Sequence, residues 1–373
     1  MLSSSNRREP WKQALQILVV TRLAFFAVAL SASWFLASGR GPHVEGFFAI
    51  WDRWDATLLM RVAAFGYTGP QTDPHATAFF PLFPLLVRGA SDLGLNPVGA
   101  GLVISAIASL VAFAYLFRLA EEEVGEGAGR RAVLYLALFP TAVFLVAPYS
   151  EALFLAGAIP AFYYARKSRW GLVGLPAAIA MGARFAGCFL LLGLLVEFLR
   201  QGNFSARRVR AGAVALGAGL APLALYSFFL YRVKGSALYY FVDQRAGWGR
   251  RLTWPLTAFR ETWGTWNPYQ PTNWIFAWRV EILAAAVGVA FVIWALIKRQ
   301  WGFAAFMGAM MASVLASSWY FSIPRMLLSL FPIPLLLAGF SRRSETRHEI
   351  VLLVIAPLAI LGVIVYTRGA WFY

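Results

Sequence analysis

Apolar segments long enough to cross a lipid bilayer recur along the whole of this chain, and they constrain its fold more than any other feature. Of its 373 residues, 60% are hydrophobic and only 13% are charged, whereas soluble domains carry about 25% charged residues. Short basic clusters, and no soluble module, separate the segments. Because about 20 apolar residues in a helix cross about 30 Å of hydrocarbon, residues 1–373 are predicted to form a single all-α, polytopic membrane domain.

Apolar length and basic flanks together predict about eleven transmembrane helices, with the N-terminus cytoplasmic and the C-terminus outside. The expected segments are 15–37, 98–119, 132–148, 151–165, 171–183, 185–199, 211–231, 277–297, 302–318, 324–340 and 350–366. Residues 171–199 lie between two basic clusters. They therefore form either two short helices that meet near Arg184 or one long tilted helix. Interfacial helices are expected in the outer loops 38–97 and 232–276.

The chain carries 33 Lys plus Arg against 17 Asp plus Glu, an excess that in a soluble protein would suggest a nucleic acid partner. Here all of the basic clusters between the segments can lie on the cytoplasmic side if the chain alternates across the membrane, so membrane lipids are the expected partners and nucleic acid is not. Cys188 is the only cysteine, which excludes an internal disulfide. His43, His75 and His348 lack metal-ligand spacing, and no cofactor-binding motif is present, so no cofactor or metal is expected.

Two carboxylates, Asp52 and Asp55, follow the first apolar segment directly. At this i, i+3 spacing they would share one face of a helix. Either they cap an interfacial helix, or one of them is a general base at the boundary between water and lipid, where partial burial favours proton transfer. Glu151 likewise either caps the next helix or faces the same cavity and holds substrate hydroxyls. A divalent cation shared by these three acids is a further alternative.

A set of arginines lies at or near the predicted outer boundary, where the positive-inside pattern does not explain them. They are Arg184, Arg325, Arg245, Arg250 and Arg251. Arginine binds phosphate in a bidentate manner, and an arginine inside the bilayer is costly without an anionic partner. These residues therefore indicate an anionic substrate, although snorkelling or pairing with lipid headgroups would also account for the loop arginines.

Several motifs occur in the order and spacing of a known family. They are Arg53-Trp54-Asp55-Ala56, Val62-Ala63 with Gly66-Tyr67, Ala78-Phe79-Phe80-Pro81-Leu82-Phe83-Pro84, Pro140 with Tyr149-Ser150-Glu151, Ala183-Arg184-Phe185-Ala186-Gly187, and Pro324-Arg325-Met326. Together they resemble the signature of the GPI mannosyltransferase 2 (PIG-V) family. The sequence departs from that signature at Phe139, where the family has Asn, and at Met326, where it has an aromatic residue. These departures concern the acceptor more than the reaction.

The resemblance implies a GT-C type glycosyltransferase that takes a sugar, usually mannose, from a polyprenyl or dolichyl phosphate at the non-cytoplasmic face. It places Asp55 as the base, with Asp52 as an assistant or alternative. High Arg, Ala and Gly usage points to a bacterial member, whose acceptor would be a different lipid or glycan. The remaining alternatives are a transporter or flippase of an anionic lipid-linked substrate, and a non-catalytic scaffold subunit.

The resulting hypothesis is an inverting transfer of mannose at the outer face of the cell membrane. Asp55 deprotonates the acceptor hydroxyl, and polyprenyl phosphate leaves. The residues expected to bind the donor phosphate are Arg184, Arg325 and Arg245. Those expected to bind substrate, or to anchor the loop in the interface, are Trp51, Trp54, Arg61, Tyr67, Phe80, Tyr149 and Glu151.

Overall fold

The computed structural model describes residues 4–36, 46–202, 204–264 and 272–372, which excludes His43. Within these ranges the regular secondary structure is helical apart from one isolated β-bridge between Leu252 and Ser317, and turns and loops connect the helices. The helices are α1 (Ser4–Phe35), α2 (Asp55–Phe65), α3 (Leu82–Asp92), α4 (Pro97–Glu123), α5 (Ala128–Ala137), α6 (Glu151–Arg166), α7 (Gly174–Ala183), α8 (Gly187–Arg200), α9 (Ala206–Lys234), α10 (Tyr239–Trp248), α11 (Pro255–Gly264), α12 (Thr272–Ile297), α13 (Trp301–Leu315), α14 (Ile323–Ser329), α15 (Pro332–Ser341) and α16 (Glu345–Thr367). Four short 3-10 helices are η1 (Ala49–Trp51), η2 (Ala76–Ala78), η3 (Ala142–Leu145) and η4 (Trp170–Leu172).

Five helices in the described part of the chain are long and apolar enough to cross a membrane, which supports a multi-pass membrane protein. They lie in α1, α4, α9, α12 and α16, and the pair α14 and α15 adds a sixth candidate if its 75° bend is counted as one broken span. The prediction of about eleven transmembrane helices is therefore not supported. Apolar helices do form at the other predicted positions, but they are too short for a regular crossing.

The reason for this error is that hydropathy reports composition and not where a helix ends. The predicted crossing 132–148, for example, forms only the 10-residue α5 and the turn η3. Helix α5 ends just before Phe139-Pro140, where the residue preceding a proline disfavours helical backbone. Even the 16-residue α6 rises only about 24 Å, less than the hydrocarbon thickness.

Arg184 decides between the two readings of residues 171–199. Its backbone is extended, with φ −156° and ψ 149°, and it separates α7 from α8. Two short helices are therefore correct. Helices also form in both predicted outer loops, as α2 and α3 in the first and as α10 and α11 in the second.

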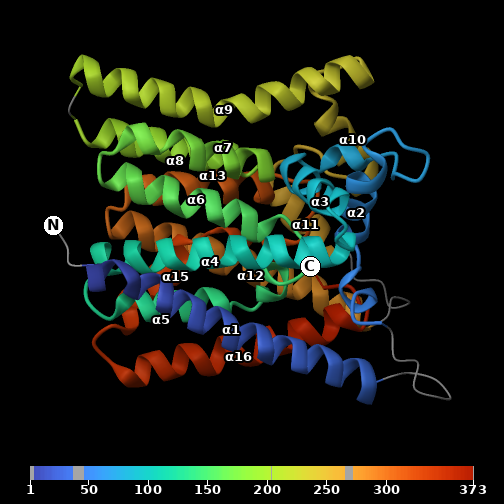
Figure 1. Cartoon of the computed structure of the whole chain (residues 1–373), viewed down its shortest axis with the longest axis horizontal. Coiled ribbons are helices and arrows are strands. Elements are labelled where there is room, and N and C mark those ends of the chain that lie inside the picture. The colour runs from blue at the N-terminus through green and yellow to red at the C-terminus, as the bar shows by residue number, and fades with distance from the viewer. Residues whose placement is uncertain (1–3, 37–45, 203, 265–271, 373) are drawn as a thin grey trace.

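The long helices and several of the short ones lie side by side across Figure 1, and α2, α3 and α10 gather at the right-hand end. Helix α4 packs on α6, α6 on α7, and α7 on α9. Gly157 permits the close contact of α6 with α7, because a Cβ atom there would lie 2.5 Å from the Ala180 nitrogen and from the Pro176 oxygen. Small residues commonly allow such approach between membrane helices.

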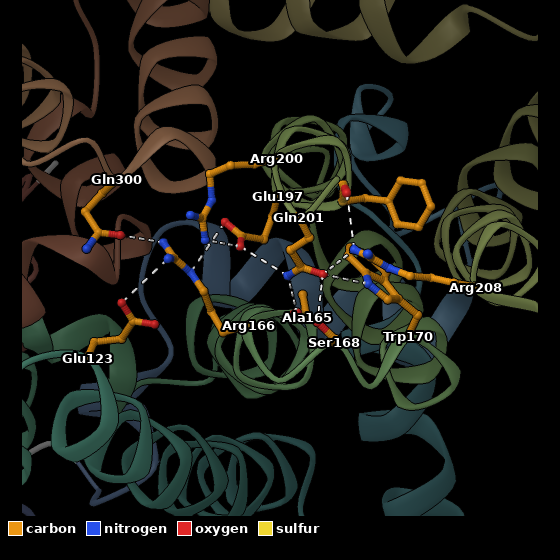
Figure 2. Close-up of polar contacts among 11 residues, drawn as sticks. Glu123, Ala165, Arg166, Ser168, Trp170, Glu197, Arg200, Gln201, Arg208 and Gln300 are labelled. Atoms are coloured by element: carbon orange, nitrogen blue, oxygen red, sulfur yellow. Dashed lines mark hydrogen bonds and ion pairs between the residues drawn. The ribbon is translucent and has the colours of Figure 1, made fainter. Parts of the chain in front are cut away.

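A buried polar cluster joins several helices at the opposite end of the bundle (Figure 2). Arg166, the last residue of α6, lies 3.5 Å from the Glu197 carboxylate on α8 and 3.6 Å from the Glu123 carboxylate on α4. It also donates to the Gln300 side chain at 2.6 Å. Several of the predicted basic clusters thus meet at one end of the bundle, away from the start of α6 and the end of α7, where Glu151 and Arg184 lie.

Candidate active site

Two acids and two arginines from four separate helical regions form a connected ion-pair group. Arg325 Nη1, on α14, donates to Asp55 Oδ2 at 2.5 Å. Arg325 Nε and Arg184 Nη1 both contact Glu151 Oε1. Because Glu151 is fully buried, the two guanidiniums compensate a carboxylate that would be unstable alone. We call these four residues the charge quartet.

Helix ends place both acids. Asp55 is the first residue of α2 and Glu151 the first residue of α6, where the positive end of the helix dipole favours a carboxylate. Neither side chain accepts a capping hydrogen bond from its own helix in the described contacts; both are directed at Arg325. The capping and the functional interpretations of these acids are therefore compatible.

Glu281 holds the helix that carries Arg325. It lies on α12, is fully buried, and accepts hydrogen bonds from the backbone nitrogens of Ser322 and Ile323 at 2.6 and 2.7 Å. It thereby satisfies free N–H groups at the start of α14. Our sequence reasoning missed Glu281, although a single acid within the apolar segment 277–297 is a recognisable signal of a polar partner.

Two non-glycine residues with left-handed backbone stand beside the quartet. Trp54, with φ 53°, precedes Asp55, and Ser322, with φ 62°, begins the turn into α14. Such conformations cost about 1–3 kcal/mol each and are concentrated at functional sites. The Trp54 indole is held in place by a hydrogen bond to the Ala370 oxygen at 3.3 Å.

A cavity of about 830 Å³ opens in front of the quartet. The predicted site residues that line it are Trp54, Asp55, Phe80, Tyr149, Arg184, Arg245 and Arg325. The structure therefore brings together seven predicted residues from both halves of the chain.

The other predicted site residues lie behind or beside the cavity. Glu151 lies beneath the arginines, and Asp52 is half-buried just before α2. Trp51 is fully buried and its carbonyl accepts a hydrogen bond from Tyr366 at 3.0 Å. Tyr67 donates to the Phe79 oxygen at 2.9 Å, and Arg61 is exposed on α2.

Three arginines on α10 and just after it give the cavity an excess of positive charge. Arg245, Arg250 and Arg251 line the cavity, and none of them pairs with a carboxylate among the described residues. Arg250 is the half-buried member and donates to the Phe321 oxygen at 3.4 Å. Arg184 and Arg325 already contact the acids of the quartet, so an anion in the cavity could bind these three arginines without first displacing a carboxylate.

Burial perturbs the titration of two groups at this wall. Desolvation lowers the pKa of the Arg250 guanidinium, while the neighbouring Tyr240 and Asp55 act in the opposite direction. Burial also raises the pKa of the Tyr240 phenol to about 12. Tyr240, which lines the cavity, therefore stays protonated at neutral pH and keeps a hydroxyl that can donate a hydrogen bond.

The described residues contain no group of three or more His, Cys, Asp or Glu side chains arranged to hold a metal ion. Glu151 is occupied by two arginines, and Asp52 does not line the cavity. The geometry therefore does not favour a cation shared by Asp52, Asp55 and Glu151.

Comparison with known proteins identifies a matching family and a similar fold. A family described as Mannosyltransferase (PIG-V) matches residues 15–206, about half of the chain. The GPI alpha-1,6-mannosyltransferase 2 of Cricetulus griseus is 32% identical over 173 residues, which are 43% of this chain and 34% of that protein. The human protein of the same name gives the same values. The match thus spans about a third of the length of these relatives.

Among solved structures, the oligosaccharyltransferase of Archaeoglobus fulgidus, in a complex with zinc and sulfate, resembles this chain in fold. The TM-score is 0.50 at 13% identity, over 95% of this chain and 53% of that one. This likeness supports the expected GT-C type of fold. At so low an identity it shows the fold alone.

Proposed function

Because the chain belongs to the mannosyltransferase (PIG-V) family, we propose that it is an inverting glycosyltransferase that moves mannose from a polyprenyl-phosphate donor to a lipid or glycan acceptor. One observation carries the proposal: Asp55 lines the same cavity as Arg245, Arg250 and Arg251, which form no ion pair with a carboxylate in the part of the chain that the structure describes. An acid for the acceptor and cations for the donor phosphate are the two components that such a transfer needs.

Asp55 is the proposed base. It accepts the proton of the acceptor hydroxyl while that oxygen forms a bond to the anomeric carbon of the sugar. The bond from that carbon to the phosphate oxygen breaks, and its electron pair leaves with polyprenyl phosphate. Attack from the face opposite the leaving group inverts the configuration. Asp52 is the less suitable base, because it does not line the cavity.

The contact between Asp55 and Arg325 sets a condition on this reaction. Asp55 must exchange Arg325 for the acceptor hydroxyl before it can take the proton. The donor phosphate is a competing anion for Arg325, so its arrival would release Asp55. Negative charge then builds on the departing phosphate, where Arg325, Arg184 and Arg245 stabilise it by hydrogen bonds that are already oriented.

The other predicted residues take supporting roles. Glu151 orients the two quartet arginines and does not touch the substrate, because it is fully buried and both arginines occupy the same oxygen. Trp54, Phe80 and Tyr149 form the wall against the sugar. Trp51 and Tyr67 hold the surrounding loops. Arg61 is exposed and would meet lipid headgroups.

We place the protein in the cell membrane with the cavity facing outward and the N-terminus in the cytoplasm. The basic clusters at the opposite end of the bundle support this orientation, since such clusters are retained inside. The donor would enter from the outer leaflet, with its phosphate at the headgroup level.

A transporter or flippase of an anionic lipid-linked substrate is the second candidate. The 75° break between α14 and α15 favours it, because transporters often bind substrate at broken helices. A flippase would move the labelled donor between leaflets and leave the sugar on it.

The test uses the full chain in liposomes with radiolabelled polyprenyl phosphate mannose, a crude lipid and glycan acceptor extract, and chelator in parallel samples. We expect transfer that survives the chelator and falls by about 10²–10⁴ in Asp55→Asn. Asp52→Asn discriminates the two acids, and Asp92→Asn, an exposed acid on α3, controls for folding. If only Asp52→Asn abolishes transfer, Asp52 is the base. If the labelled donor changes leaflet and no mannose is transferred, the protein is a flippase and not a glycosyltransferase.

A further inference from the structure

A buried carboxylate behind the cavity is not used by the proposed reaction. Asp243, on α10, is only 1% exposed. Its Oδ2 accepts a hydrogen bond from Thr77 Oγ1, and its Oδ1 lies 3.3 Å from His75 Nδ1. Burying a carboxylate is unfavourable unless such partners satisfy it. The proposed reaction does not explain why Asp243 is buried here.

The cluster joins two walls of the cavity from behind. Tyr240, Gln244 and Trp248, spaced by four residues along α10, line the cavity, and Asp243 faces η2 instead. The chain leaves η2 directly into Phe79 and Phe80, which also line the cavity. Asp243 therefore ties α10, which carries Arg245 and leads into Arg250 and Arg251, to the segment that carries Phe79 and Phe80.

Further contacts show that α10 packs closely against residues 75–80. Gln244 Nε2 donates to the Ala78 oxygen at 3.4 Å, and Tyr226 on α9 donates to the Thr77 oxygen at 2.8 Å. A Cβ atom at Gly247 would come within 3.0 Å of the His75 Cβ. Glycine at this position thus allows α10 to approach the loop closely.

We propose that Asp243 is a positioning residue that holds α10 against residues 75–80 and thereby sets where Arg245 and Arg250 stand relative to Asp55. Thr77 is its essential partner, because it is buried with Asp243, whereas His75 is half-exposed. The consequence for a substrate rests on the proposed function: a loosened α10 weakens binding of the donor phosphate and leaves proton transfer to Asp55 unaffected.

The first experiment measures donor KM and kcat of the full chain in liposomes. Thr77→Val removes the hydroxyl and keeps the shape of the side chain, whereas Thr77→Ser keeps the hydroxyl. We expect donor KM to rise about tenfold in Thr77→Val and in Asp243→Ala with a smaller fall in kcat, because ground-state binding of the donor by Arg245 and Arg250 is lost while Arg184 and Arg325 keep their places. Thr77→Ser and the surface control Asp92→Asn should match the wild type. A fall in kcat at unchanged KM would overturn the proposal.

The second experiment does not depend on activity. Trypsin cleaves after arginine, and Arg245, Arg250 and Arg251 report whether α10 is held in place. We expect faster cleavage at these sites in Thr77→Val and Asp243→Ala but not in Thr77→Ser, with the thermal unfolding midpoint close to that of the wild type. Unchanged cleavage, or faster cleavage at every accessible arginine together with a lower midpoint, would overturn the positioning role. If the wild type transfers no mannose, the proposed function fails while this digestion still decides the role of Asp243.

Discussion

Arg325 and Asp55 are 270 residues apart in the sequence, yet the Arg325 Nη1 donates to the Asp55 Oδ2 at 2.5 Å. The same guanidinium reaches Glu151 through its Nε and lies over the Tyr149 ring at 4.6 Å. One side chain thus connects the starts of α2 and α6. A planar guanidinium with five donors can do this, whereas a single ammonium group cannot reach both acids with the same geometry.

Arg325→Lys should therefore lower kcat/KM by about a hundredfold, the loss typical of one oriented donor at a site of developing charge. The measurement is mannosyl transfer under donor saturation and below it. Arg88→Lys, at an exposed position on α3, should leave transfer unchanged. Equal activity of Arg325→Lys and the wild type would show that charge alone suffices and that the bridging geometry is not needed.

Glu281→Ala should destabilise the start of α14 and displace Arg325. The backbone N–H groups of Ser322 and Ile323 donate hydrogen bonds to the Glu281 carboxylate. The substitution leaves these two buried N–H groups without their acceptor. We expect a loss of about 1–3 kcal/mol in unfolding free energy, together with reduced transfer. The measurement is denaturant unfolding in detergent, with Glu261→Ala at an exposed position of α11 as the matched control. The same midpoint for both variants would contradict a role for Glu281 in holding α14.

Gly157→Ala should disturb the contact of α6 with α7, because the added methyl group would meet backbone atoms of Pro176 and Ala180 at 2.5 Å. Overpacking of this kind costs about 1–3 kcal/mol. Gly217→Ala on α9 is the matched control, since nothing lies within 4 Å of a Cβ there, and the better helix former should be neutral or stabilising by up to about 1 kcal/mol. Thermal unfolding of both variants checks the prediction: Gly157→Ala should have the lower midpoint. A lower midpoint for Gly217→Ala would contradict it.

Glu197→Ala should reveal how much the polar cluster of Figure 2 contributes to stability. Glu197 is fully buried and pairs with the buried Arg166 and the partly exposed Arg200. Its removal leaves Arg166 with the carboxylate of Glu123 at 3.6 Å, and breaking such a buried pair costs up to about 3–5 kcal/mol. Glu122, whose side chain is 40% exposed, pairs with Lys167, and Glu122→Ala should cost only about 0–1 kcal/mol. Chemical unfolding measures both losses. Transfer at low temperature should be unchanged in either variant, because both residues lie far from the cavity. Similar losses of unfolding free energy in the two variants would mean that burial does not decide the strength of these ion pairs.

The site could be predicted in part because its residues stand in local motifs. Asp55, Arg184 and Arg325 were singled out from the sequence, and the structure places all three on one cavity. The partners of Glu281 and Asp243 could not be predicted in this way. Each is an acid whose significance depends on backbone or hydroxyl donors from a distant segment, and no local pattern encodes such a partner.

By itself, the amino-acid sequence determined that the chain is helical and apolar enough for a membrane, and where α1, α4, α9, α12 and α16 lie, because hydropathy and helix formation depend on neighbouring residues. Only the tertiary structure decided how many helices are long enough to cross and which charges are paired. Helix ends respond to packing as well as to composition, and Glu151 becomes a buried partner of Arg184 and Arg325 only when segments far apart in the sequence meet. Pairing of charges is a property of distance in space, which the order of residues does not contain.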